Sequence, residues 1–398
     1  MTINLAGGGS TPRKVRRARL IPIWALILGA FVLSLIGTSP HYIGSDSYVV
    51  GLIGKFLCFA IFALSIDLIW GFTGILSLGQ AVYFGIGAYM VALSMKLNYT
   101  LENATRYGSN IPDFMEWNGL TEVPAFMAPL LSTPVAVALA LAIPTLLAFI
   151  FGVITFKRHI YGVYCAVITL AEALILERFI VEYQAYTGGF NGITDYSNLR
   201  GAPFLWVIIA VTVVCLIGAR ALTHSRIGTV LKSIRDNDVR AEFMGYNVAN
   251  YRIFVFCVSA FMAAGAGAMY AAWVGIVSFL DAGPMFSVEG VILTAVGGRA
   301  TLIGPFIVTF LVRGLEFVLS SSAWLSWLSE YWQFFMGALF IAVVLWIPDG
   351  IVGTIGNWLR KRGTGTLSQI RDDQDRLAHD RQRDWDPAGG TKPGKDPV

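Results

Sequence analysis

Residues 70–80 read Trp-Gly-Phe-Thr-Gly-Ile-Leu-Ser-Leu-Gly-Gln, and this stretch decides the fold. It carries glycines and hydroxyl side chains but no charge, and apolar runs at 49–70 and 81–97 flank it. Glycine permits helix breaks and close backbone approach. At membrane depth, irregular backbone is tolerated only where protein buries it or where it lines a polar cavity. The stretch therefore predicts either a pathway-lining break between two membrane helices or a tight cytoplasmic turn with helices packed closely around it.

The composition places the flanking sequence in lipid. Of 398 residues, 56% are hydrophobic and only 14% are charged, whereas about a quarter of a soluble domain is charged. Nine Lys/Arg and seven Asp lie after residue 359, and five more basic residues lie within 13–19. The remaining core is too apolar to cover itself with a solvated surface. This excludes a soluble enzyme, a nucleic-acid binder and a disordered chain, and it predicts an all-α polytopic membrane protein.

The apolar runs predict about ten transmembrane helices. A helix needs about 20 apolar residues to span the hydrocarbon core. The candidate spans are 20–37, 49–70, 81–97, 134–156, 160–182, 204–220, 252–274, 302–320 and 331–347. The shorter run 285–298 is predicted to cross as a tenth segment, because the basic triplet at 360–362 would otherwise lie outside.

Charge asymmetry orients these spans, because cytoplasmic connections carry an excess of Lys and Arg. The connections at 157–158 and 220–252 are basic, whereas the alternate ones carry mainly acidic residues. Both termini are therefore expected in the cytoplasm. The predicted organisation is a basic N-terminus at 1–19, a transmembrane domain at 20–358 with a periplasmic loop at 98–133 and a cytoplasmic loop at 221–250, and a disordered cytoplasmic tail at 359–398.

Several ionisable residues lie inside the predicted spans. Each central charge costs about 2.5–3.5 kcal/mol on insertion scales, so these groups should face partners or a polar cavity. Arg313 and Glu316 are at i,i+3, which predicts an intrahelical ion pair. Glu172 has no basic residue within a turn on its own helix, and it faces either a pathway or a hydrogen-bonding neighbour helix.

The cytoplasmic stretch 226–248 predicts an amphipathic helical element. Its apolar positions approximate one stripe, and the segment Arg240-Ala241-Glu242 is followed by Gly245. A short helix that ends in glycine forms a rigid knob suited to docking in a partner's groove. The alternative is a helix that lies in the lipid interface.

Nucleotide and metal motifs are lacking in the sequence. The nearest match to a P-loop, Gly389 to Lys395, is followed by Asp396 instead of Ser or Thr, and it ends the chain. The four cysteines lie within apolar runs without metal-ligand spacing. We therefore expect a membrane protein without ATPase activity, enzymatic activity or a bound cofactor of its own.

Four segments resemble a known family: GFTGILSLGQAVYFGIGAYM (71–90), TGGFNGITD (187–195), RDNDVRAEFMGYNV (235–248) and AVGGRATLIGPF (295–306). They look like the permease subunits of branched-chain amino acid and urea ABC importers, and the match runs from about residue 50 to 355. The resemblance implies a bacterial inner-membrane complex with a second related permease, two cytoplasmic ATPases that bind ATP and Mg²⁺, and a periplasmic substrate-binding protein. It also implies that 235–248 is the coupling helix, with Arg235, Asp238, Arg240, Ala241, Glu242 and Gly245.

The outer segment 111–132 is similar to the urea permeases, so the resemblance predicts urea as substrate. Gln80 stands where urea-type members often have His, and the Gly-Gln-Ala form also occurs in amino acid permeases. A branched-chain amino acid permease is the alternative, and an ion-coupled transporter with Glu172 and Asp67 as its relay is a third reading. Urea would require amide and hydroxyl partners, whereas a zwitterionic amino acid would require charged or helix-dipole partners. The candidate pathway residues are Gly71, Thr73, Gly74, Ser77, Gln80, Glu172 and Asn191.

Overall fold

The computed structural model describes residues 48–103, 110–321, 331–346, 350–351 and 353–354. The basic N-terminus, the first predicted span, the 360–362 triplet, the charged tail and the P-loop near-match lie outside these residues. Within the described residues the protein is helical and contains no strand; one isolated antiparallel bridge joins Ile193 to Val277. The all-helical prediction is confirmed for this part of the chain.

Helices occupy every predicted span that falls in the described residues. They are α3 (Tyr48–Ile66), the π-helix η1 (Asp67–Gly71), α4 (Gln80–Glu102), α7 (Thr133–Phe156), α8 (Val163–Glu182), α10 (Ala202–His224), α13 (Val248–Val274), α14 (Pro284–Gly297), α15 (Ile303–Ser321) and α17 (Trp332–Trp346). Four helical segments in the described part are long and apolar enough to cross a membrane: Val50–Gly71, Thr133–Phe156, Pro203–His224 and Val248–Val274. Ten crossings and cytoplasmic termini stay predictions.

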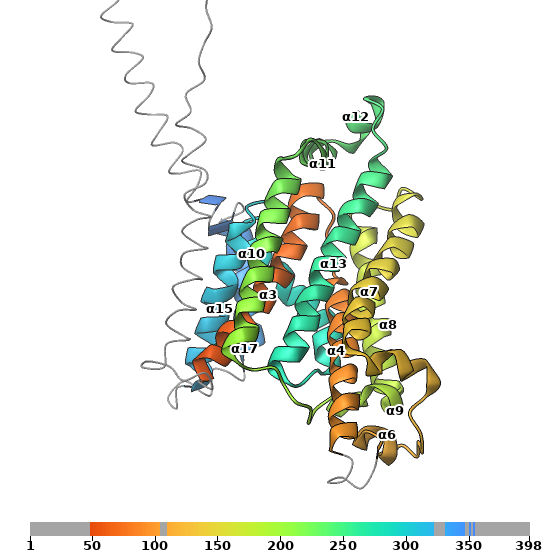
Figure 1. Cartoon of the computed structure of the whole chain (residues 1–398). Helices are drawn as coiled ribbons and strands as arrows, with labels where there is room; N and C mark the ends of the chain where they lie inside the picture. The colour runs from red at the N-terminus through yellow and green to blue at the C-terminus, as the bar shows by residue number, and fades with distance from the viewer. Residues whose placement is uncertain (1–47, 104–109, 322–330, 347–349, 352, 355–398) are drawn as a thin grey trace, which may run out of the picture.

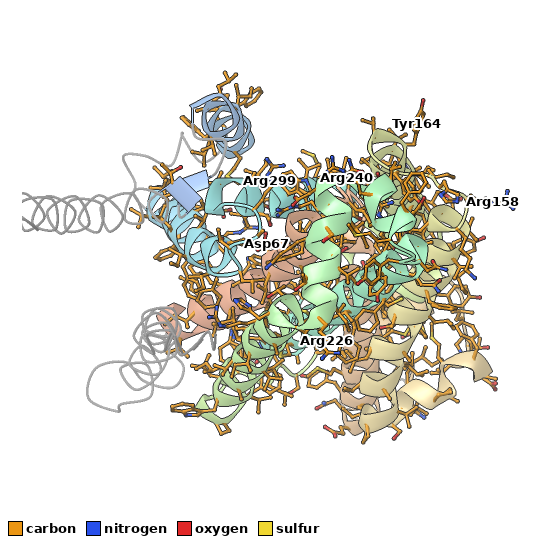
Figure 2. The ribbon with its side chains drawn as sticks, turned by 90° about the horizontal axis from the view of Figure 1, so that it is seen from above. Asp67, Arg158, Tyr164, Arg226, Arg240 and Arg299 are labelled. Atoms are coloured by element: carbon orange, nitrogen blue, oxygen red, sulfur yellow. The ribbon has the colours of Figure 1, made fainter. Side chains whose placement is uncertain are left out.

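Basic residues gather at one end of the bundle. The short helices α11 (Arg226–Asp236) and α12 (Asp238–Phe243) lie at one end, and α6 (Asp113–Trp117) and α9 (Gln184–Thr187) lie at the other (Figure 1). Viewed from the α11/α12 end, Arg158, Arg226, Arg240 and Arg299 surround the helix ends (Figure 2). These arginines come from three separate connections, which places the predicted basic connections at one end.

Helix α13 packs closely against α4 through small residues. A Cβ atom on Gly87 would meet the carbonyl oxygen of Ala264, and one on Gly267 would meet the carbonyl oxygen of Phe84. Small residues allow helix backbones to approach closely where lipid supplies no hydrophobic force between helices. Beside this contact an aromatic cluster fills the core, in which the Phe62 and Phe286 rings stack with centroids 4.5 Å apart.

At the end opposite α11 and α12, polar contacts hold the connections together. Lys96 pairs with Asp113 of α6 at 2.9 Å and donates to the Asp195 carbonyl at 3.2 Å. Helix α4 continues to Glu102, beyond the expected start of the outer loop at 98. The 3-10 helix η2 (Ala125–Leu131) covers part of this end. The described parts of the 98–133 segment therefore contain short helices.

We predict that Gly267→Val destabilises the protein, because the added side chain cannot fit against the Phe84 carbonyl. Overpacking of this kind costs about 1–3 kcal/mol or more. Gly218→Val is the matched control, because Gly218 lies in α10 and a Cβ atom added there would meet nothing within 4 Å. The thermal midpoint in detergent should fall for the first variant and stay near wild type for the second. Equal midpoints would contradict the packing described for α4 and α13.

Candidate functional site

The stretch 70–80 forms a break inside the helical bundle. Helix α3 passes through η1 to Gly71, residues 74–79 are irregular, and α4 begins at Gln80. The Gln80 side chain hydrogen-bonds Ser259 of α13. Helix α13 begins at Val248, so at a rise of about 1.5 Å per residue Ser259 lies about 16 Å from the start of the helix. Helix α4 therefore begins deep in the bundle. The irregular segment 74–79 therefore runs into the bundle before α4 begins.

Side chains of neighbouring helices bind the irregular backbone. The Leu78 N–H donates to Thr169 Oγ1 of α8 at 3.0 Å, and the Ala81 N–H donates to Ser287 Oγ of α14 at 2.9 Å. Gly79 lies so close to α8 that an added Cβ would be 2.5 Å from the Thr169 carbonyl oxygen. Because the bilayer core offers no water to unpaired backbone groups, these hydroxyls allow the break to exist there.

The polar side chains predicted to line a pathway make internal contacts. Gln80 is fully buried, and its Nε2 donates to Ser259 Oγ at 2.8 Å and to Ser65 Oγ at 3.3 Å. Thr73 Oγ1 donates to the Ile69 carbonyl at 2.5 Å, and Ser77 Oγ accepts the Gly79 N–H at 3.4 Å.

Asn191 is exposed and ends the 3-10 helix η3 (Gly189–Asn191), near the Ile193–Val277 bridge at the α6/α9 end. The structure therefore does not bring Asn191 together with Gln80. Glu172 accepts a hydrogen bond from the buried Tyr83 hydroxyl of α4 at 3.3 Å. This is the hydrogen-bonding neighbour helix that the sequence offered as the alternative to a pathway. A pathway role for these residues stays a prediction.

Asp67 joins the broken helix to the connection between α14 and α15. Its carboxylate is buried and accepts the N–H of Ala300 at 2.6 Å and the N–H of Leu302 at 2.8 Å. Ala300 and Leu302 have φ angles of 62° and 60°, a left-handed conformation that is costly for side chains with a Cβ. Two charge-assisted hydrogen bonds hold this loop conformation.

Arg235 connects this loop to helix α11. Its Nη1 donates to the Gly71 carbonyl at 2.9 Å, while its Nε and Nη2 contact Asp236 Oδ1. Gly71 in turn packs against Ala300, where an added Cβ would be 2.9 Å from the Ala300 Cα. The guanidinium of Arg299 lies 5.0 Å from the Trp70 ring centroid. A continuous set of contacts therefore runs from α11 through Gly71 to the 298–302 loop.

Helix α12 is a short knob with both ends capped. Asn237 Oδ1 accepts the Arg240 N–H at 2.9 Å at its start. At its end Gly245 has φ 87°, its N–H donates to the Glu242 carbonyl, and the Tyr246 N–H donates to the Ala241 carbonyl. This pattern is a Schellman motif. The glycine-ended knob predicted from the sequence is present.

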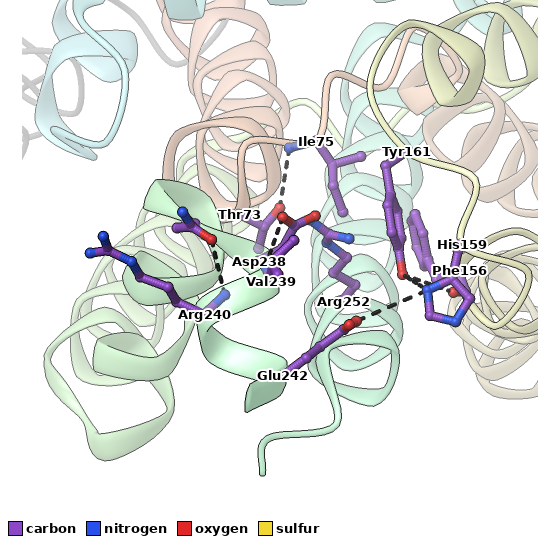
Figure 3. A network of polar contacts seen from close by, with 11 residues as sticks. Thr73, Ile75, Phe156, His159, Tyr161, Asp238, Val239, Arg240, Glu242 and Arg252 are labelled. Carbon is purple, nitrogen blue, oxygen red and sulfur yellow. Dashed lines mark hydrogen bonds and ion pairs between the residues drawn. The ribbon is translucent and has the colours of Figure 1, made fainter. Parts of the chain in front are cut away.

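Contacts on one side of α12 leave the other side open (Figure 3). Asp238 accepts from Arg252 of α13 at 3.4 Å, and Glu242 lies 4.0 Å from His159 in the α7–α8 connection. Ala241 is buried, whereas Phe243 is 88% exposed and Met244 is 73% exposed. An exposed apolar tip on a rigid, anchored helix is suited to docking against another protein.

The buried ion pair on α15 has a third member. Arg313 Nη1 pairs with Glu316 at 2.7 Å, as the i,i+3 spacing predicts. Its Nη2 also pairs with Glu289 of α14 at 2.8 Å. Glu289 was missed in the sequence, because no local spacing relates it to Arg313. Asn237 and Arg252 were missed as supports of α12 for a related reason, although Asn before Asp238 is a usual N-cap.

Apolar helices long enough to cross a membrane surround the break at 74–79, which is the architecture of a helical membrane protein. The chain belongs to the family described as "Branched-chain amino acid transport system / permease component", whose sequence pattern matches residues 48–344.

Individual relatives are more distant. The chain is 23% identical to the high-affinity branched-chain amino acid transport system permease protein LivM of Salmonella typhimurium and 24% identical to that of Escherichia coli K12; each match covers 74% of this chain and 68% of the relative. It is 26% identical to the ribose import permease protein RbsC of Haemophilus influenzae, over 51% of this chain and 64% of that protein. No solved structure matches.

We predict that Asp67→Asn loosens the 298–302 loop. The amide keeps one acceptor but presents an NH₂ group to a backbone N–H, so a charge-assisted bond worth about 1.5–3 kcal/mol is lost. Hydrogen exchange measured by mass spectrometry should accelerate in 298–303. Exchange at the Ile193–Val277 bridge, at the other end of the bundle, is the internal control and should not change. Unchanged exchange in 298–303 would contradict the role assigned to Asp67.

Proposed function

We propose that this protein is a membrane subunit of an ATP-binding cassette importer that moves branched-chain, apolar amino acids inward across the bacterial inner membrane. Its partners would be a second related permease, two cytoplasmic ATPases and a periplasmic substrate-binding protein. One observation carries the proposal. The exposed knob α12 follows directly on α11, whose Arg235 contacts the break at Gly71.

The contacts suggest how ATP hydrolysis on a partner would reach the membrane. An ATPase that closes on ATP would push the apolar tip at Phe243, and α12 would move with α11 because Asn237 caps the helix directly after Asp236. Arg235 would transfer the movement to Gly71, and Asp67 would transfer it to the 298–302 loop. The helices on both sides of the break would then tilt between outward-open and inward-open arrangements.

Two considerations favour an amino acid over the predicted urea. The relatives at 23% and 24% identity are named as branched-chain amino acid permeases. Of the amide and hydroxyl groups that urea would require, Thr73 Oγ1 and Gln80 Nε2 are bonded to neighbouring protein groups, and the buried Gln80 Oε1 is an acceptor without a partner among the described residues. Urea transport is kept as the second candidate because the 111–132 segment resembles urea permeases.

An ion-coupled transporter has less support. It would use Asp67 and Glu172 as a relay, but Asp67 binds two backbone N–H groups and Glu172 accepts from Tyr83. Uptake that survives loss of the ATPase subunits and follows the proton gradient would establish that alternative.

We predict that Phe243→Asp prevents ATPase docking, because it places a charge in the apolar tip. Co-purification of ATPase subunits with the tagged permease should fall about tenfold or more, the loss expected for a buried aromatic anchor, and uptake should fall with it. Trp117→Asp is the control: Trp117 is similarly exposed at 74%, but it ends α6 at the opposite end of the bundle. If Phe243→Asp retains the ATPases, α12 is not the docking element.

We predict that a strain lacking this chain loses uptake of labelled leucine and regains it on complementation. Labelled urea, tested under nitrogen limitation in the same strains, separates the two substrates. Loss of urea uptake with leucine uptake preserved would overturn the amino acid proposal and support the urea reading.

A further inference from the structure

A charged cavity of about 430 Å³ lies between α3, α14, α15 and α17. Lys55 lies in the first half of α3, which begins at the end opposite α11 and α12 (Figure 1), and Glu289 lies in α14, which begins beside the break where Ser287 binds the Ala81 N–H. The cavity therefore lies in the half of the bundle that the proposed orientation places toward the periplasm. Its volume falls within the range of small-molecule sites, about 300–1,000 Å³.

The charges in this cavity are separated into a paired group and a single ammonium. Arg313 is bound to Glu289 and Glu316, and its guanidinium also lies 4.4 Å from the Phe59 ring centroid. Lys55 Nζ lies 5.6 Å from the same ring, and no carboxylate within the described residues comes within 4.0 Å of it. An ammonium without an ion pair in a membrane-embedded cavity is costly and typically marks a substrate or ion path.

A second unpaired donor belongs to the same cavity. Arg313 is more than nine-tenths buried, and its Nε finds no hydrogen-bond partner among the described residues. Leaving a buried charged donor unsatisfied is expensive. A purely structural role for Arg313 requires only its two glutamates. Such a role explains neither the unpaired Arg313 Nε nor the Lys55 ammonium, which has no ion pair among the described residues.

The separation of the charges suits a zwitterion. Arg313 contacts the two glutamates, and the Lys55 ammonium stands at a separate position in the cavity. Asp281 of the 3-10 helix η4 (Phe279–Ala282) also lines the cavity, but its Oδ2 accepts from the Ser278 N–H and hydroxyl. Asp281 therefore has hydrogen-bond donors of its own within the η4 turn.

Apolar side chains complete the cavity. Phe59, Met285, Ile292 and Met336 line it together with the charged groups. Small-molecule sites generally combine such apolar walls with a few convergent polar groups. A charged head group and an aliphatic side chain can therefore both be accommodated.

We propose that this cavity binds an apolar α-amino acid during its passage through the membrane. The ligand's carboxylate would contact Lys55, its ammonium would contact Glu289, and its side chain would pack on Phe59 and Ile292. The proposal rests on the proposed function and names where in this chain the substrate binds. Neutral urea would leave Lys55 without a charged partner.

The test uses the importer complex purified through a tag on this chain and a leucine analogue with a photoreactive diazirine in its side chain. After irradiation, mass spectrometry should locate adducts in 52–59 and 285–292. Excess unlabelled leucine should remove them. Lys55→Met should reduce these adducts about tenfold, the loss expected for one charge-assisted hydrogen bond, and Lys55→Arg should retain them.

Two controls separate binding from folding. Lys157→Met removes an exposed lysine at the other end of the bundle and should leave labelling unchanged. Each variant complex must elute as wild type does on size exclusion; if Lys55→Met does not, Lys55→Gln replaces it in the same comparison.

The outcomes also distinguish the two proposals. If leucine is transported but the adducts lie elsewhere, or if Lys55→Met labels as wild type does, the cavity proposal is wrong and the proposed function stands. If the wild-type importer carries urea and no leucine, the proposed function is wrong and the cavity proposal is overturned with it.

Discussion

The absence of water in the bilayer core is the constraint on which this structure depends. A helix satisfies its own backbone there, but the break at 74–79 cannot. It persists because Thr169 and Ser287 reach it from two other helices and because Ser259 and Ser65 bind the Gln80 side chain where α4 begins. The neighbouring helices must therefore approach closely, and glycines at the α4–α13 contact make this possible. The break and the packing around it depend on each other.

Buried charges follow the same constraint. Asp67 is tolerated because two backbone N–H groups face it, and those groups belong to a loop whose left-handed residues would otherwise be disfavoured. The Asp67 carboxylate thus stabilises the 298–302 loop, and the two N–H groups of the loop offset the free-energy cost of burying the carboxylate. Arg313 is tolerated between two glutamates. Asp67 connects segments more than 230 residues apart, whereas Arg313 connects the consecutive helices α14 and α15.

The sequence predicted features that depend on local spacing. Apolar run length located the helices, i,i+3 spacing located the Arg313–Glu316 pair, and Gly245 located the end of α12. Contacts between distant segments were not predictable: nothing in the spacing connects Lys55 or Glu289 to Arg313. For the same reason the sequence grouped Asn191 with Gln80, although the fold places one at an exposed end and buries the other. Chemistry alone suggested that grouping, and tertiary packing decides it.

The internal capping of α12 has a consequence for how such importers diversify. Its terminal backbone groups are bonded within the segment 237–246, so the knob retains its shape whatever protein it meets. Recognition is then left to a few exposed side chains, Val239, Phe243 and Met244. Under the proposed docking of an ATPase on α12, exchange of these few side chains would allow a duplicated permease to acquire a different ATPase while its membrane core stays unchanged. Insulation from unrelated ATPases in the same cell would depend on equally few positions.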